Sequence, residues 1–173
     1  MTETTTSPST TRSRAATPLV TGLNHVAITT GDLDGLCAFY ADLFDAEIVE
    51  TPAPPGTRAA TIRIGAGAGL AVLEAPGNPH VRGSATMLDR GHLDHVAFDV
   101  AGPAELEEVR RRVVALGAGD GTVSDYGPML SVYFEDPDGM GTEACWLRDP
   151  TFTGAHAPQP FTGDLRALAS PVG

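Results

Sequence analysis

Apolar positions along the chain follow two spacings, and the same order of spacings occurs twice. Apolar residues recur at helical intervals within 32–44 and again within 103–116, which predicts two amphipathic helices. Gly117 lies where the C-terminal cap of the second helix is expected. Each helix is followed by three short runs typical of β-strands: 46–50, 58–64 and 70–75 after the first, and 121–126, 129–135 and 142–147 after the second.

A short motif precedes each predicted helix. LNHVA begins at Leu23 and LDHVA begins at Leu93, seventy positions later, and each has the pattern of a strand. The chain therefore contains two predicted βαβββ units. One such unit has a sheet face that it cannot bury alone. We expect an α+β fold in which two paired βαβββ modules form a cup-shaped mixed sheet.

The domain boundaries follow from these units. The first module is expected over 19–76 and the second over 92–148, with a Gly- and Pro-bearing linker over 77–91, and the two modules form one domain. Residues 1–18 are rich in Thr and Ser and are expected to be a disordered tail. Residues 149–173 are expected to be a C-terminal tail.

Composition narrows the classes of function. A net charge of -11 with only eleven basic residues argues against a nucleic-acid partner. No apolar run approaches the roughly 20 residues of a transmembrane helix, so no membrane partner is expected. The first eighteen residues lack the apolar segment of a secretory signal. We therefore expect a cytoplasmic protein in which Cys37 and Cys145 are free thiols.

The two motif histidines are the first candidates for chemistry. Because side chains alternate along a strand, His25 and His95 share repeat-equivalent positions and point into the same predicted concavity. Imidazole is the commonest metal ligand. Glu143 lies among Thr, Ala, Cys and Trp, where an unpaired carboxylate would be costly and a cation would compensate its charge. Two histidines and one carboxylate predict a metal site with open coordination positions.

The counterpart of Glu143 in the first module is left open by the sequence. The equivalent strand offers Ala71 or Leu73, depending on the register. Glu74 points to the other face of that strand, and a slip of one residue would make it a fourth ligand.

Three further side chains are expected to line the cup. The offset of seventy matches Arg63 of the first module with Tyr133 of the second. Thr61 lies two residues before Arg63 and therefore shares its strand face. We expect Tyr133 to donate a hydrogen bond and Arg63 to anchor an anionic group of a substrate. Cys145 shares the strand face of Glu143, and we interpret it as a small residue lining the substrate pocket rather than as a nucleophile.

The chain resembles the vicinal oxygen chelate superfamily, which includes glyoxalase I, extradiol dioxygenases, epimerases, and bleomycin- and fosfomycin-resistance proteins. The resemblance is carried by LNHVAITTGDLDGLCAFYADLF, LDHVAFDV and SVYFEDPDGMGTE, which together span 22–148. It implies paired βαβββ modules and a divalent metal that chelates two neighbouring oxygens of a small-molecule substrate. It also implies that His25, His95 and Glu143 are the metal ligands.

Several reactions are compatible with this resemblance. Three ligands with open positions favour an Fe(II) enzyme of the extradiol dioxygenase type or a transferase like the fosfomycin-resistance proteins, and we prefer the first. Mn(II), Zn(II), Co(II) or Ni(II) are other possible metals. The extradiol pattern fits at Tyr133 and Glu143, but Tyr126 stands where that pattern has its acid–base histidine. A phenol with a pKa of about 10 is a poor base at neutral pH.

Tyr126 and Tyr133 are the catalytic candidates that remain. The alternative functions are a metal-assisted isomerase or lyase, of the glyoxalase or epimerase kind, and a drug-binding antibiotic-resistance protein. We expect a homodimer, and the sequence leaves open whether the modules pair within one chain or across two.

Overall fold

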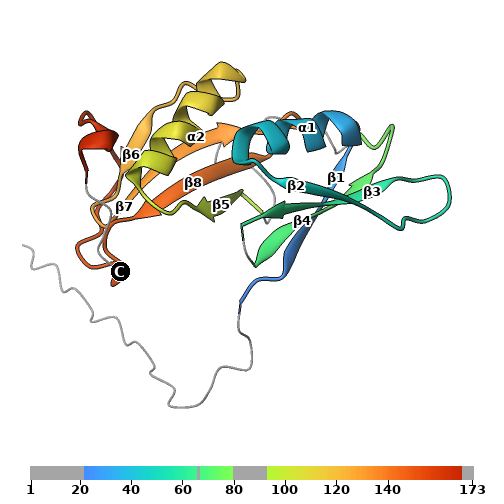
Figure 1. The fold of residues 1–173 in the computed structure, drawn as a ribbon, viewed down its shortest axis with the longest axis horizontal. Helices are drawn as coiled ribbons and strands as arrows, with labels where there is room; N and C mark the ends of the chain where they lie inside the picture. The colour runs from blue at the N-terminus through green and yellow to red at the C-terminus, as the bar shows by residue number, and fades with distance from the viewer. Residues whose placement is uncertain (1–21, 66, 80–92, 169–173) are drawn as a thin grey trace, which may run out of the picture.

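The two predicted βαβββ modules are both present in the computed structural model, which describes residues 22–65, 67–79 and 93–168 (Figure 1). The expected N-terminal tail up to residue 18, and most of the expected linker, lie outside the described residues. The elements of the first module are β1 (His25–Thr30), α1 (Leu33–Phe44), β2 (Glu47–Thr51), β3 (Ala59–Ile64) and β4 (Ala68–Glu74). Those of the second are β5 (His95–Asp99), α2 (Pro103–Ala115), β6 (Val123–Asp125), β7 (Met129–Glu135) and β8 (Gly141–Leu147).

The segment after β8 adds two short elements. Strand β9 (Gln159–Pro160) pairs with β6 and extends the second sheet, and the 3-10 helix η1 (Leu165–Ala167) packs against α2. Leu165 is buried in the core. The first twenty residues of the stretch expected to be a tail are therefore attached to the second module.

The two sheets share one topology. The first has the strand order β1-β4-β3-β2 and the second the order β5-β8-β7-β6-β9. In each sheet the motif strand runs parallel to the last strand of its module and forms an edge. The motif histidines are therefore at equivalent places, and His25 pairs with Gly69 as His95 pairs with Gly141.

The ends of both helices follow from local sequence. The carboxylate of Asp32 accepts a hydrogen bond from the Gly35 N–H at 3.0 Å and caps the start of α1. Pro103 opens α2, where its missing N–H has no cost. Gly117 follows the last turn of α2 with a φ of 68°, which is the left-handed conformation that a glycine C-cap supplies.

A single hydrophobic core joins the modules. Helices α1 and α2 contact each other and lie on the same side of the two sheets (Figure 1). The sheet faces that meet the helices carry the apolar residues of the core, whereas the alternate residues of each strand point to the opposite face. The core side of the sheets is formed by Ile62, Leu70, Val72, Leu130, Val132, Phe134, Ala144 and Trp146.

One buried polar contact crosses between the modules within this core. The Tyr40 hydroxyl on α1 donates to the Asp136 carboxylate at the turn between β7 and β8, at 3.2 Å. The other carboxylate oxygen of Asp136 accepts from the N–H groups of Asp138 and Met140. Burial, and next the charge of Asp136, raise the pKa of the Tyr40 phenol, so the hydroxyl stays a donor. This hydrogen bond links α1 of the first module to the β7–β8 turn of the second.

Replacing Tyr40 by phenylalanine is expected to lower the free energy of unfolding by about 1–3 kcal/mol, because a buried carboxylate oxygen loses its donor. Urea denaturation followed by circular dichroism measures the change. Tyr133→Phe is the matched control, since the Tyr133 hydroxyl is buried without a hydrogen-bond partner among the described residues. Equal losses of stability in the two variants would contradict this role of Tyr40.

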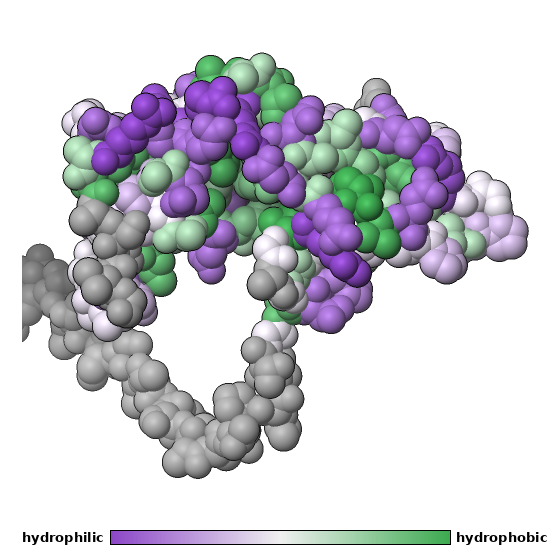
Figure 2. All heavy atoms as spheres, viewed as in Figure 1, coloured by the Kyte–Doolittle hydropathy of each residue, from purple (hydrophilic) through white to green (hydrophobic). Residues whose placement is uncertain are grey.

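The outer surface of α2 is charged. Figure 2 shows hydrophilic residues over most of this helix. Arg111 and Arg112 both contact Glu108, three and four residues earlier, and Arg110 contacts Glu107. Arg112 also pairs with Asp45 at the end of α1, so this basic cluster is balanced by carboxylates on both helices. Over the residues that the structure describes, no helix has the length and apolar character needed to cross a membrane.

Candidate functional site

The second module brings two of the candidate ligands together. Strand β5 places His95 and strand β8 places Glu143 on the face that points away from the core. The Nε2 atom of His95 lies 3.5 Å from Oε2 of Glu143. Glu143 is only 8% exposed, so its carboxylate is withdrawn from solvent beside the imidazole.

This pair fits a divalent ion. Two donor atoms on one ion, at bond lengths of about 2.1 Å, lie about 3.0–3.4 Å apart, close to the separation observed here. The Nδ1 atom of His95 is 2.8 Å from a carboxylate oxygen of Asp94. A carboxylate that is ionised can only accept, and Asp94 is the nearer of the two carboxylates that flank this ring, so Nε2 is the ring nitrogen that faces Glu143 and is open to a metal ion.

Two neutral side chains, Cys145 and Tyr126, also lie beside Glu143. Burial, and next the Glu143 charge, raise the pKa of the Cys145 thiol, which donates a hydrogen bond to that carboxylate. Tyr126 lies beside the same two residues, and its pKa is raised first by burial and then by the Glu143 charge. The Tyr126 hydroxyl also has a hydrogen bond with Ser131, which is buried. Both groups are therefore neutral proton donors at neutral pH.

Tyr133 packs against the histidine. Its ring lies edge-on to the ring of His95, with 6.2 Å between ring centroids, and it is paired across the sheet with Glu143. A side-chain carbon at Gly141 would collide with the Tyr133 hydroxyl and would lie 2.9 Å from the Asp94 carbonyl oxygen. Glycine at this position lets the start of β5 approach Tyr133 closely.

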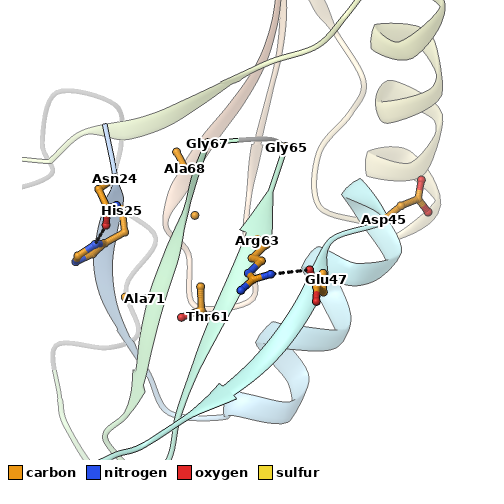
Figure 3. A pocket seen from close by; sticks show the side chains of 11 residues that line it. Asn24, His25, Asp45, Glu47, Thr61, Arg63, Gly65, Gly67, Ala68 and Ala71 are labelled. Atoms are coloured by element: carbon orange, nitrogen blue, oxygen red, sulfur yellow. Dashed lines mark hydrogen bonds and ion pairs between the residues drawn. The ribbon is translucent and has the colours of Figure 1, made fainter. Parts of the chain in front are cut away.

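The first module presents His25 on an open face. His25 is exposed on β1 and lines a pocket of about 750 Å³ together with Thr61, Arg63 and Ala71 (Figure 3). The Nδ1 atom of His25 lies 2.7 Å from the side-chain oxygen of Asn24. The Arg63 guanidinium also stands in this pocket, where it pairs with Glu47 on β2 at 3.2 Å. The pocket is thus polar and combines an imidazole, one guanidinium and the carboxylates of Asp45 and Glu47.

His25 does not join His95 and Glu143 in one chain. Among the described residues, no group of three His, Cys, Asp or Glu side chains is close enough to hold one metal ion. The physical reason is the packing of the modules: the helices occupy the shared core, and the two faces that carry the candidate ligands both point away from it. A cup with all three ligands is not closed within a single chain.

The register decides between the alternatives for the first module. Ala71 pairs with Ala27 as Glu143 pairs with Ala97, so Ala71 is the counterpart of Glu143. Glu74 lies on the helix side of β4, where its carboxylate accepts from the Leu33 N–H at 3.1 Å. It is held at the start of α1, away from the pocket of His25.

The match of Arg63 with Tyr133 is wrong by two residues. Thr61 pairs with Ala71 as Tyr133 pairs with Glu143, so Thr61 is the counterpart of Tyr133. The second module has two more residues than the first between its motif strand and its third strand, and the offset therefore changes from seventy to seventy-two. Arg63 still points to the open face, nearer the turn between β3 and β4.

Asn24 and Asp94 are the contacts that the sequence reasoning overlooked. They occupy the variable position of the two LxHVA motifs, directly before each histidine. A side chain able to accept a hydrogen bond at both repeat positions was a usable signal, because metal-binding histidines commonly donate their second ring nitrogen to such a group.

Comparison with known proteins identifies the fold. The chain resembles a solved glyoxylase/bleomycin resistance protein/dioxygenase domain from Frankia sp. EAN1pec at 24% identity and a TM-score of 0.64, over 75% of this chain and 99% of that one. It also resembles FosX, a genomically encoded fosfomycin resistance protein from Listeria monocytogenes solved with Mn(II) and sulfate. That match has 24% identity and a TM-score of 0.54, over 74% of this chain and 93% of FosX.

These identities are below 25%, so the likeness to solved structures establishes the fold alone. A comparison with curated proteins gives no significant match. The family model for the Glyoxalase/Bleomycin resistance protein/Dioxygenase superfamily matches residues 22–144, which is more than half of the chain. The chain therefore belongs to the Glyoxalase/Bleomycin resistance protein/Dioxygenase superfamily.

Proposed function

We propose that this protein is a divalent-metal-dependent enzyme acting on a small molecule with two neighbouring oxygens. His95 and Glu143 of one chain, with His25 of a second copy, would hold the ion. The observation that carries the proposal is the His95–Glu143 pair, a buried carboxylate facing an imidazole nitrogen at 3.5 Å with the other ring nitrogen held by Asp94. A bound divalent ion would act as a Lewis acid toward the substrate oxygens.

A second copy is part of the proposal because the site is incomplete in one chain. His25 stands on an open sheet face, and among the described residues it belongs to no group of three His, Cys, Asp or Glu side chains that could hold a metal ion. Strands β1 and β5 are both sheet edges, each paired with a single strand in the described part of the chain. Edges of this kind are free to meet a partner, so a symmetric homodimer would place the first module of one chain over the second module of the other.

The remaining side chains of the two faces would bind and protonate the substrate. Tyr126 and Tyr133 are the proposed catalytic residues, and Tyr126 would act as a proton donor rather than a base, since burial and the Glu143 charge raise the pKa of its phenol. Cys145 would line the pocket as a neutral thiol hydrogen-bonded to Glu143. Arg63 would orient an anionic substituent, in exchange for part of its contact with Glu47.

The specific reaction that the sequence favours is Fe(II) oxygenation of the extradiol type. A second candidate is a metal-assisted addition, isomerisation or lyase reaction with Mn(II) or a similar ion. One observation favours this second candidate: the group beside Glu143 at the acid–base position is a phenol whose pKa is raised by burial and not a base. A cytoplasmic location is also part of the proposal, supported by the free thiols of Cys37 and Cys145.

Metal analysis and oxygen uptake test these proposals. Protein purified without added ions is expected to contain a divalent metal that is lost in His95→Ala, and unchanged metal in that variant would overturn the ligand assignment. An iron-loaded sample is then given a panel of catechols in an oxygen electrode. Oxygen uptake would support the extradiol reaction, and its absence with every catechol would reject that reaction in favour of the non-oxidative one. A protein that binds bleomycin-type drugs without any metal would instead be a drug-binding protein.

A further inference from the structure

The residue before each motif histidine contacts the same ring nitrogen. Asp94 is 2.8 Å from Nδ1 of His95, and Asn24 is 2.7 Å from Nδ1 of His25. Both contacts are between adjacent residues at the start of an edge strand. Two independent modules thus place an oxygen acceptor against Nδ1 and leave Nε2 available.

We propose that Asp94 and Asn24 are positioning residues for the two histidines. Asp94 fixes which ring nitrogen of His95 carries the proton, whereas Asn24 allows either ring nitrogen of His25 to carry it. The inference rests on the proposed function, because it assumes that Nε2 of each ring is the ligating atom. It goes beyond that function by naming two residues outside the ligand set and by assigning different behaviour to the two rings.

The difference follows from hydrogen-bond chemistry. Two acceptor-only carboxylates flank the His95 ring, but Asp94 lies within hydrogen-bond distance of Nδ1 at 2.8 Å, whereas Glu143 is 3.5 Å from Nε2, so the single proton of a neutral ring is expected on Nδ1. A carboxamide can turn either its oxygen or its amide group toward the ring, so Asn24 is compatible with both tautomers of His25. His95 is therefore prepared for the metal before binding, whereas His25 is free to adjust when the second copy arrives.

The side chains around the His95 ring support this role of Asp94. Glu143 occupies the Nε2 side of the His95 ring at 3.5 Å, and the edge-on Tyr133 ring packs beside it. A side-chain carbon at Gly141 would lie 2.9 Å from the Asp94 carbonyl oxygen, so glycine at this position lets β8 pack closely against the start of β5. With Tyr133 beside its ring and Asp94 at Nδ1, His95 directs Nε2 toward Glu143.

The test is the ring-nitrogen NMR spectrum of metal-free, 15N-labelled full-length protein at alkaline pH, where an ordinary imidazole is neutral. The His95 signals, assigned by their loss in His95→Ala, are expected to show the proton on Nδ1. A proton on Nε2 of His95 would overturn the inference. This result needs only the wild-type protein and His95→Ala, so it does not depend on the folding of any Asp94 variant.

Exchange variants test the two contacts separately. Asp94→Asn is expected to give a mixture of His95 tautomers and to weaken Mn²⁺ binding by about 10-fold, and Asp94→Ala by about 10- to 100-fold. Asn24→Asp is expected to fix the His25 proton on Nδ1. Asp42→Asn on the exposed side of α1 makes the same charge change away from the site and is expected to alter neither measurement.

The outcomes separate this inference from the proposed function. If His95→Ala abolishes Mn²⁺ binding but Asp94→Asn and Asp94→Ala leave tautomer and affinity unchanged, the positioning role is wrong and the metal site stands. If His95→Ala leaves Mn²⁺ binding unchanged, the proposed function fails, while the metal-free spectrum still decides whether Asp94 sets the tautomer.

Discussion

Replacing Glu143 by glutamine is expected to weaken the binding of Mn²⁺ or Fe²⁺ by more than about 100-fold, beyond the range that changes next to a ligand produce. The amide is the same size as the carboxylate but carries no charge, so the packing against Cys145 is kept while the anionic donor is lost. Isothermal titration of metal-free protein measures the affinity. In the wild type, bound metal is also expected to raise the melting temperature, because it binds the folded state, and this rise should disappear in the variant.

The metal-free variant is expected to be at least as stable as the metal-free wild type. Glu143 is 8% exposed, and an ionised carboxylate in such a place is costly in the absence of a cation. A loss of stability together with a loss of metal would instead indicate a structural role. Glu50→Gln is the matched control, because Glu50 is exposed on β2, and it should change neither property.

Mixing two deficient variants is expected to restore metal binding when the ligands come from two chains. His25→Ala and His95→Ala dimers should each lack an intact site. After random subunit exchange, half of the dimers are mixed and each has one intact site of two, so metal stoichiometry should recover to about a quarter of the wild-type value in a symmetric dimer. Co-refolding the two variants and counting bound Mn²⁺ after gel filtration measures the recovery.

A second mixture is the control for this experiment. His95 and Glu143 lie on the same module, so His95→Ala mixed with Glu143→Gln leaves both sites of every mixed dimer broken and should recover no metal. If neither mixture recovers metal, the site does not form between chains. If His25→Ala alone keeps full metal binding, His25 is not a ligand.

Local pattern predicted the elements of this protein well. The predicted helix over 103–116 corresponds to α2 (Pro103–Ala115), and the strand over 129–135 is β7 with the same bounds. Alternation also predicted the faces, so that Glu143 and Cys145 lie opposite the core residues Ala144 and Trp146. These features depend on residues close in sequence, and the period of the side chains carries them directly.

Register was harder to predict than the elements. The offset of seventy between the motif histidines suggested that Arg63 matches Tyr133, yet strand pairing matches Thr61 with Tyr133. The second module has two extra residues between its motif strand and its third strand, and an alignment that matches only the LxHVA motifs does not detect them. The sheet face predicted for Arg63 is nevertheless correct, because a shift of two residues along a strand leaves a side chain on the same face.

The sequence by itself determined the two βαβββ modules, the faces of their strands, and the three side chains proposed as ligands. Only the tertiary structure decided that α1 and α2 share one core, joined by the buried contact of Tyr40 with Asp136. Packing between distant elements depends on how whole surfaces fit, and periodicity does not encode that fit. For this reason the repeat that predicts two equivalent histidines does not reveal that, among the described residues of one chain, His25 does not join His95 and Glu143 in one group of ligands.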